Sequence, residues 1–231
     1  MSNQQDTEAY GHLSDKYFSA IAKFIESRVG IKLPQTKRTM VEGRLRKRVR
    51  ALGLPGLNAY GAHLFDKGGL EAETIHLIDC VTTNKTDFFR EPSHFEFLRD
   101  VAVPQLTVRH GGRPPQLKVW SAASSTGAEA YTAAMVLQDL VAAGKVARFS
   151  ILGTDISTEV LREARTAIYP RAFVAPVPAA MQQRYLMRSR DPRDEVVRVT
   201  PELRRTVHFE RLNLMDDSYP FDRDVDVIFC S

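Results

Sequence analysis

The stretch LKVWSAASSTGAEAY, residues 117–131, decides the fold of this chain. It begins as an apolar strand, passes through small residues at 121–125, and reaches Thr126-Gly127, where a helix is expected over residues 128–143. Small residues at a strand-to-helix turn let a ligand approach the backbone closely, and the start of the helix presents free N–H groups. The stretch therefore predicts an α/β fold with a ligand-binding turn, although an ordinary turn without a ligand has the same pattern.

The residues of this turn favour one kind of ligand. Glu129 falls in the first turn of the expected helix, where it would repel a phosphate. The turn also lacks the G-x-G-x-x-G spacing of dinucleotide-binding sites. A ligand with hydroxyl groups and a cationic centre fits better, and S-adenosylmethionine has both.

The composition is that of a globular protein, with 231 residues, 43% hydrophobic and 26% charged. No apolar run approaches the ~20 residues that span a bilayer, and the polar residues 1–11 lack the core of a signal peptide. Cys80 and Cys230 lie far apart in apolar stretches, so we expect buried free thiols and no metal site. Together these features predict a cytoplasmic protein that does not insert into a membrane.

The first ninety residues predict a small all-helical unit. Ser14 and Asn58 are suited to cap helix N-termini, and Gly30 is suited to the residue after a helix C-terminus. Apolar side chains recur every three or four residues between these signals. The expected helices span residues 15–29, 36–52, 59–65 and 70–81.

The helix expected over residues 36–52 is strongly basic, with Glu42 as its one acid. Its apolar stripe predicts that Arg46, Lys47 and Arg50 point away from the core. Like charges four residues apart cost helix stability, so charge of one sign favours an acidic partner. A solvated helix face is the simpler interpretation.

The strand expected over residues 149–155 ends in Asp155, and Ser157 then caps a helix over 158–168. An acid at the end of the second strand of a doubly wound sheet commonly binds ribose hydroxyls. The alternative is an aspartate that accepts backbone N–H groups at the helix entry. Because Ser157 is available as the cap, we favour the ribose role for Asp155.

A loop at residues 82–92 connects the two parts of the chain. Phe88 and Phe89 are expected to anchor it in a core, which would hold Arg90 rigidly for a carboxylate. The simpler interpretation is a surface ion pair between Arg90 and Glu91, which contributes little to stability.

The rest of the chain predicts further α/β structure with one interruption. A helix over 93–101 is followed by a linker-like break before the strand at 117–120, made by Pro104 and then GGRPP at residues 111–115. Residues 171–205 depart from the alternation of strands and helices. Within them we expect a helix over 179–185, followed by a small antiparallel β-structure. Strands at 207–212 and 224–230 return to the main sheet, the last of them buried.

Five stretches, taken in order, resemble the CheR family of chemotaxis receptor glutamate O-methyltransferases. They are TTNKTDFFRE (82–91), VWSAASSTGAEAY (119–131), ILGTDISTEVLREAR (151–165), FERLNLMD (209–216) and DVIFC (226–230). The resemblance covers residues 14–230. It implies a helical N-terminal domain (14–90), then a Rossmann-like methyltransferase domain (91–231) with an antiparallel β-subdomain inserted at about 171–205.

The resemblance also implies an activity and its site. The activity is methyl transfer from S-adenosylmethionine to receptor glutamate side chains, which gives methyl esters and S-adenosylhomocysteine. Arg90 would bind the methionine carboxylate, Asp155 the ribose hydroxyls and Glu129 the amino end. No side chain is assigned to the chemistry itself beyond positioning by Arg90. The matched cofactor contacts are Asn84, Thr86, Arg90, Glu129, Asp155, Asn213 and Leu214.

The partner implied by the resemblance is the acidic helical cytoplasmic region of methyl-accepting receptors. The basic helix would dock it, and we expect the protein to act as a monomer. The pI of about 9.1 raises the alternative of a nucleic-acid methyltransferase, but the matched stretches carry no base-reading aromatic motif, so no nucleic acid is expected. The docking residues would be Arg38, Arg44, Arg46, Lys47 and Arg50.

Two departures from the family pattern affect these expectations. The usual C-R-N-x-x-I-Y-F run is missing after Cys230-Ser231, so we expect a chain without its C-terminal end, lacking some cofactor contacts and a tyrosine near the transferred methyl group. GAEA at 127–130 replaces the commoner GEEP, which leaves one of two acids. A module that binds S-adenosylmethionine or its product without turnover is the alternative function.

Overall fold

The computed structural model describes residues 10–82, 84–191, 193–221 and 224–230, which form two compact units. One unit comprises Met1–Thr83 with Asn213–Asp217, and the other comprises Asn84–Leu212 with Ser218–Ser231. The sequence-based boundary at 90/91 therefore lies inside the second unit. The reason is hydrogen bonding, because the Asn84 carbonyl and the Phe89 N–H are both bonded to residues of the second unit.

The first unit is all-helical, as the sequence predicts. Ser14 caps the first long helix by accepting the Tyr17 N–H at 3.4 Å, and Gly30 ends it in the left-handed conformation, with φ of 71°. Apolar side chains from every long helix are buried between them. The helices are α2 (Asp15–Val29), η1 (Gln35–Lys37), α3 (Arg38–Ala51), α4 (Leu57–Phe65) and α5 (Leu70–Val81).

Two details of the first unit differ from the sequence-based expectation. Asn58 does not cap α4, which begins at Leu57, two residues before the expected start, and the Asn58 Oδ1 accepts the Ser14 N–H at 2.7 Å instead. The basic helix begins at Arg38 rather than Thr36, because the 3₁₀ turn η1 takes up the preceding residues.

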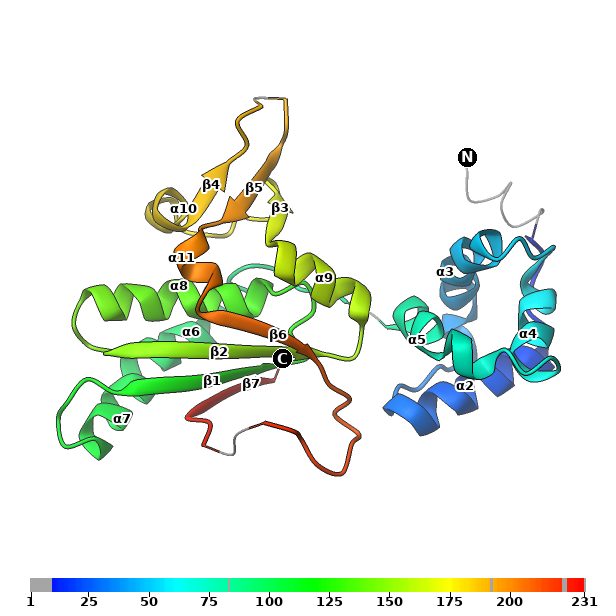
Figure 1. Cartoon of the computed structure of the whole chain (residues 1–231), viewed down its shortest axis with the longest axis horizontal. Helices are drawn as coiled ribbons and strands as arrows, with labels where there is room; N and C mark the ends of the chain where they lie inside the picture. Colours follow the sequence, from blue (N-terminus) through cyan, green and yellow to red (C-terminus); the bar gives the residue numbers. More distant parts are fainter. Residues whose placement is uncertain (1–9, 83, 192, 222–223, 231) are drawn as a thin grey trace. The chain divides into compact units, whose positions relative to one another are not determined.

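The second unit is built on a parallel four-stranded sheet in the order β6-β2-β1-β7. Figure 1 shows these strands side by side with a long helix, α8, running along them. Strand β1 pairs with β2 so that Val119 lies opposite Ile151, and on its other side with β7 so that Trp120 lies opposite Ile228. The strands are β1 (Gln116–Ala122), β2 (Arg148–Asp155), β6 (Val207–Arg211) and β7 (Val227–Cys230).

The crossovers from β1 to β2 and from β2 to β6 contain helices, as is usual for parallel pairing, whereas the described residues between β6 and β7 contain none. One continuous apolar core joins the sheet to these helices and to Phe88, whose side chain is 1% exposed. The helices of the second unit that flank the sheet are α6 (Pro92–Phe97), η2 (Leu98–Ala102), α7 (Val103–Arg109), α8 (Ala128–Ala142) and α9 (Thr158–Thr166).

The expected break is confirmed at residues 111–115, which lie outside helices and strands. It is wrong at Pro104, since helical structure runs from Pro92 through to Arg109. Pro104 lacks an N–H and its ring clashes with the carbonyl four residues earlier in an α-helix. The π-helical turn η2 lies immediately before α7, with the Val103 N–H bonded to the Leu98 carbonyl. This wider turn accommodates the proline without ending the helix.

A second, antiparallel sheet with the strand order β3-β5-β4 confirms the predicted insertion. In Figure 1 it projects beyond α8, away from the larger sheet. The helix expected over 158–168 ends earlier, because Ala167 is left-handed with φ of 52° and Ile168 enters β3. Its elements are β3 (Ile168–Pro170), α10 (Ala179–Tyr185), β4 (Leu186–Arg188) and β5 (Val196–Val199), and α11 (Pro201–Arg204) returns to the larger sheet.

The final strand, β7, is less buried than its apolar sequence predicts. Of its described residues, Phe229 is buried, but Ile228 is 56% exposed. Strand β7 lies at the edge of the described sheet, so one of its sides has no neighbouring strand there. The expectation of two buried thiols is therefore wrong: both are free, but Cys80 is half-buried and Cys230 is exposed.

Candidate cofactor site

The turn after β1 is tightly folded. Ala123, Ser125 and Gly127 have φ of 56°, 50° and 87°, which lie in the left-handed region that only glycine adopts readily. A Cβ on Gly127 would lie 2.9 Å from Phe209 Cζ, so the start of α8 packs directly on β6. Left-handed non-glycine residues in such a cluster are typical of ligand-binding sites.

Asp155 lies at the end of β2, and the turn holds its carboxylate in place. One oxygen accepts the Ser125 N–H at 2.8 Å and the other accepts the Ser157 N–H at 2.9 Å. Ser157 still caps α9 with its own hydroxyl. These two bonds orient the Asp155 carboxylate. The alternative, an aspartate that accepts backbone N–H groups at the helix entry, is thus confirmed for the Ser157 N–H, and the ribose role remains a prediction.

Glu129, in the first turn of α8, is held over the end of β1. Its Oε1 accepts a hydrogen bond of 2.7 Å from the hydroxyl of Ser121, which is fully buried in that strand. Each of the two acids is thus bonded to a serine, Glu129 to Ser121 of β1 and Asp155 to Ser125 of the turn that follows β1. Such an arrangement suits hydroxyl and ammonium groups, which donate hydrogen bonds to carboxylates.

Two hydroxyl groups of the turn are buried without a partner. Ser124 Oγ and Thr126 Oγ1 are shielded from solvent, and neither has a hydrogen-bond partner among the residues that the structure describes. Buried polar groups are normally paired, and leaving one unpaired costs about 1–3 kcal/mol. The two acids supply hydrogen-bond acceptors, and these hydroxyls can both donate and accept.

The loop that carries Arg90 is anchored as the sequence predicts. Phe88 packs edge-on against Tyr169 at a ring-centroid distance of 5.1 Å, and the Phe89 N–H donates to Thr132 Oγ1 at 3.2 Å. Arg90 itself is exposed, and its guanidinium donates to the Lys85 carbonyl at 3.0 Å. Within the described ranges no ion pair joins it to Glu91, so the simple surface-pair interpretation finds no support there.

The other predicted cofactor contacts are less closely grouped. The Asn84 carbonyl accepts a hydrogen bond from Ser125 Oγ at 3.0 Å, which brings this residue to the turn, and Thr86 is half-buried in the same loop. Asn213 and Leu214 belong to the first unit, where the Asn213 amide donates to the Arg28 carbonyl at 2.9 Å. The structure therefore groups Asn84, Glu129 and Asp155 and leaves the roles of the others as predictions.

Several of the five predicted docking residues are bonded or buried inside the first unit, and Arg50 also donates to the Tyr10 hydroxyl at 3.4 Å. Arg38 bonds Asp15 and Glu42, and Arg44 donates to the Thr82 carbonyl at 2.6 Å. Arg46 was expected to point away from the core, but it is only 7% exposed.

The burial of Arg46 follows from its position on α3. It lies four residues after Glu42 and four before Arg50, on one ridge of the helix. Glu42 accepts the Leu13 N–H at 3.0 Å, and Arg50 lies over the ring of Tyr10, so the segment before α2 covers this ridge. The apolar stripe alone underestimates how much of the helix is buried. Lys47 and Arg50 remain exposed.

The fold and the site together define a class of protein. A parallel sheet, a turn of small residues after its first strand and an acid at the end of its second strand are features of Rossmann-like domains that bind nucleoside cofactors. The second acid and the absence of a dinucleotide fingerprint favour an S-adenosylmethionine-dependent methyltransferase over a dinucleotide-binding protein.

Comparison with known families identifies the particular family. Residues 16–82 match the all-alpha domain of CheR methyltransferases, and residues 84–231 match their S-adenosylmethionine-binding domain. The chain belongs to the CheR methyltransferase family. The resemblance found in the sequence is thus confirmed, and S-adenosylmethionine is the methyl donor that the matched domain indicates.

Curated relatives cover nearly all of the chain. The chemotaxis protein methyltransferases of Salmonella typhimurium and Escherichia coli are each 39% identical over 218 residues, 94% of this chain and 72% and 73% of those proteins. That of Borreliella burgdorferi is 33% identical over 231 residues, 99% of this chain and 80% of its own length. None of the described helices is both long and apolar enough to cross a membrane.

Proposed function

We propose that this protein transfers a methyl group from S-adenosylmethionine to glutamate side chains of chemotaxis receptors, with S-adenosylhomocysteine as the second product. Its relatives are named chemotaxis protein methyltransferases, which supports a role in chemotaxis. The observation that carries the proposal is the pair of acids, Glu129 and Asp155, that Ser121 and Ser125 hold at the ends of two neighbouring strands.

In this proposal each polar residue of the site binds one part of the donor. Asp155 accepts the ribose hydroxyls, and Glu129 faces the amino end. Arg90 binds the methionine carboxylate with its planar guanidinium, a geometry suited to a bidentate contact. Further contacts come from Asn84, Thr86, Asn213 and Leu214.

The residues of this chain act mainly by binding and positioning. S-adenosylmethionine supplies an electrophilic methyl group on a sulfonium centre. The accepting glutamate has a reference pKa of about 4.3, so it is already an anion at neutral pH. The protein therefore needs no general base, which agrees with a site made of acids, hydroxyls and backbone N–H groups. Holding the carboxylate in line with the methyl group accounts for most of the expected rate enhancement.

The receptor region that this protein would bind is acidic and helical. Lys47 and Arg50 are exposed on one side of α3, and we propose that they contact it. Exposed charges act over about 10 Å at 0.1 M salt, so docking should depend on ionic strength. The protein would act as a monomer on the cytoplasmic side of the receptor.

Methyl transfer to isolated receptor membranes tests the proposal. The full-length protein is incubated with S-adenosylmethionine labelled in the methyl group, and label in the receptor band is counted. Receptor-dependent label that is lost in an Asp155→Ala variant supports the proposal. Tight binding of the donor without transfer to any receptor would instead favour a regulatory module that binds the cofactor without turnover.

A further inference from the structure

The second unit contains another concave site. Residues of strand β6 and of the helices α8, α9 and α11 line it. Its volume is about 610 Å³, within the range of pockets that hold small molecules. Of the residues that the structure describes around this pocket, none belongs to the turn at 121–129. Its polar lining consists chiefly of Tyr131, Arg165, Arg204, Arg205, His208 and Glu210.

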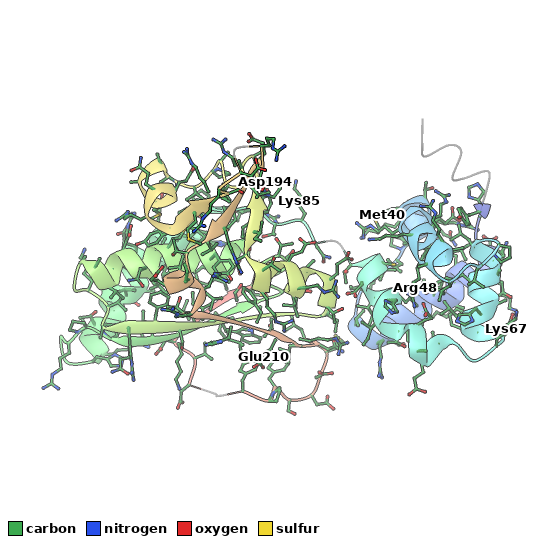
Figure 2. The ribbon with its side chains drawn as sticks, turned by 45° about the horizontal axis from the view of Figure 1, so that its top comes forward. Met40, Arg48, Lys67, Lys85, Asp194 and Glu210 are labelled. Atoms are coloured by element: carbon green, nitrogen blue, oxygen red, sulfur yellow. The ribbon has the colours of Figure 1, made fainter. Side chains whose placement is uncertain are left out.

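The charges around this pocket are unbalanced. Three guanidinium groups line it, and among the described lining residues Glu210 is the one carboxylate. Glu210 belongs to β6 and is labelled in Figure 2. Like charges gathered around a concave surface repel one another and raise the local positive potential. An anion in the pocket would relieve this repulsion.

One of the three arginines is fixed by a hydrogen bond to the backbone, and a second has a nitrogen that is not satisfied within the described residues. Arg165 donates to the Phe209 carbonyl at 2.7 Å, which ties its guanidinium to β6. Arg204 Nε is shielded from solvent and has no hydrogen-bond partner in the described part of the chain. A guanidinium that is only partly satisfied gains more from binding an anion than one that is already paired.

Arginine charges also act on Tyr131, which lines the pocket. Burial raises the pKa of the Tyr131 hydroxyl, while the nearby charges of Arg204 and Arg198 act in the opposite direction. Arg198 belongs to β5 and donates to the Thr166 carbonyl at 3.0 Å. A fourth guanidinium therefore acts on the same region as the three that line the pocket.

We propose that this arginine pocket binds a small ligand with two or more negative charges on phosphoryl groups. Guanidinium groups bind phosphoryl oxygens through paired, charge-assisted hydrogen bonds, and several arginines can share the oxygens of one diphosphate. S-adenosylmethionine carries a cationic sulfonium and no phosphate, so it is poorly suited to this pocket. The ligand is therefore a molecule other than the methyl donor.

Calorimetric titration of the full-length protein tests this proposal. Inorganic pyrophosphate is the first probe and a nucleoside triphosphate the second, with S-adenosylhomocysteine present to occupy the donor site. Arg205→Gln is the principal variant, because Arg205 is exposed and its loss should leave the fold intact. The control is Arg162→Gln, which removes the same charge from an exposed position on α9 that does not line the pocket.

Arg205→Gln is expected to weaken pyrophosphate binding about tenfold, the loss of one charged hydrogen bond. Arg162→Gln should change it less than about twofold. Equal affinity for both probes would show that the pocket recognises phosphoryl groups alone. Tighter binding of the nucleotide would show that the pocket also contacts the nucleoside.

Three results would overturn the proposal. The first is no binding of either probe at millimolar concentration. The second is equal weakening by both variants, which would mean unspecific attraction to a basic surface. The third is Arg205-dependent binding of a polyglutamate peptide without binding of pyrophosphate, which would assign the pocket to an acidic protein segment. Failure of receptor methylation would not affect these measurements, because they need no turnover.

Discussion

At the scale of single residues, Asp155 is the most sharply defined group of the candidate site. Two backbone N–H groups fix its carboxylate at the end of β2. Replacing Asp155 with Ala should weaken binding of S-adenosylhomocysteine by about 1–3 kcal/mol, the range for hydrogen bonds to a charged group. Calorimetric titration measures this change.

A matched control for this substitution is Asp194→Ala, which removes an exposed carboxylate from the connection between β4 and β5. The control should bind the product as the unmodified protein does. Circular dichroism would confirm that both variants remain folded. Unchanged affinity in folded Asp155→Ala would remove this residue from the ribose site.

Arg90 gives a second prediction at this scale. Its loop is anchored by Phe88, while its guanidinium is exposed and available to a ligand. If the planar group forms a bidentate contact with the methionine carboxylate, Arg90→Lys should weaken cofactor binding by about 1–2 kcal/mol although the charge is kept. Arg99→Lys, at another exposed position, should have no effect. Equal binding by Arg90→Lys and the parent protein would identify Arg90 as a surface charge.

Some residues of the site were predictable from the sequence and others were not. Asp155 could be placed because acids at strand ends follow from the α/β alternation alone. The serines that hold the acids could not, since Ser121 and Ser125 meet Glu129 and Asp155 only after left-handed residues fold the turn back. The small size of these residues was a visible signal, but it does not specify their hydrogen bonds.

At the scale of elements, the basic helix α3 carries the prediction about docking. Lys47→Ala/Arg50→Ala should leave the unit folded and cofactor affinity unchanged, because both side chains are exposed. Binding to receptor should weaken, and its dependence on salt should become shallower. A control with the same loss of charge is Lys23→Ala/Lys32→Ala, at exposed positions outside α3. Equal effects of the two double variants on receptor binding would exclude a specific docking surface on α3.

The contact between α3 and α5 gives a prediction about pH. Arg48, labelled in Figure 2, bonds Glu73 through two nitrogens at 2.7 and 2.6 Å. These hydrogen bonds hold the pKa of Glu73 below its usual value. A lowered folded-state pKa means that this stabilisation is present above the unfolded value of about 4.3 and is lost as pH falls through the folded-state pKa.

Urea unfolding followed by circular dichroism between neutral and acidic pH measures this effect. Glu73→Gln should lower stability at neutral pH and should reduce the further loss on acidification. Glu71→Gln, an exposed neighbour on α5, should behave as the parent protein does. An acid-induced loss of the same size in Glu73→Gln would mean that another group is responsible.

The elements themselves were largely predictable, and their exceptions have physical causes. Caps and apolar periodicity located α2 and α5 correctly, because both signals are local in sequence. The path through Pro104 was not predictable, since it depends on the π-helical turn η2. The burial of Arg46 was also not predictable from the helix pattern, because the segment that covers Arg46 comes from outside the helix.

At the scale of the whole molecule, the division into a helical unit and an α/β unit follows from the sequence, but its boundary does not. Asn84 and Phe89 belong to the second unit because of hydrogen bonds to Ser125 and Thr132, far along the chain. Hydrogen bonds between residues so far apart cannot be predicted from local sequence patterns. The order of the strands was predictable in part, because two parallel strands joined by a helix lie in one sheet.

The central claim is that the turn after β1 and the end of β2 hold a methyl donor for esterification of receptor glutamates. The most direct measurement is to incubate the full-length protein with labelled donor and receptor membranes and to map the labelled residues by mass spectrometry. The account predicts label on receptor glutamates, release of the label by mild alkali as expected for an ester, and loss of label with Asp155→Ala. Label on lysine, arginine or nucleic acid, or receptor labelling that survives Asp155→Ala, would contradict it.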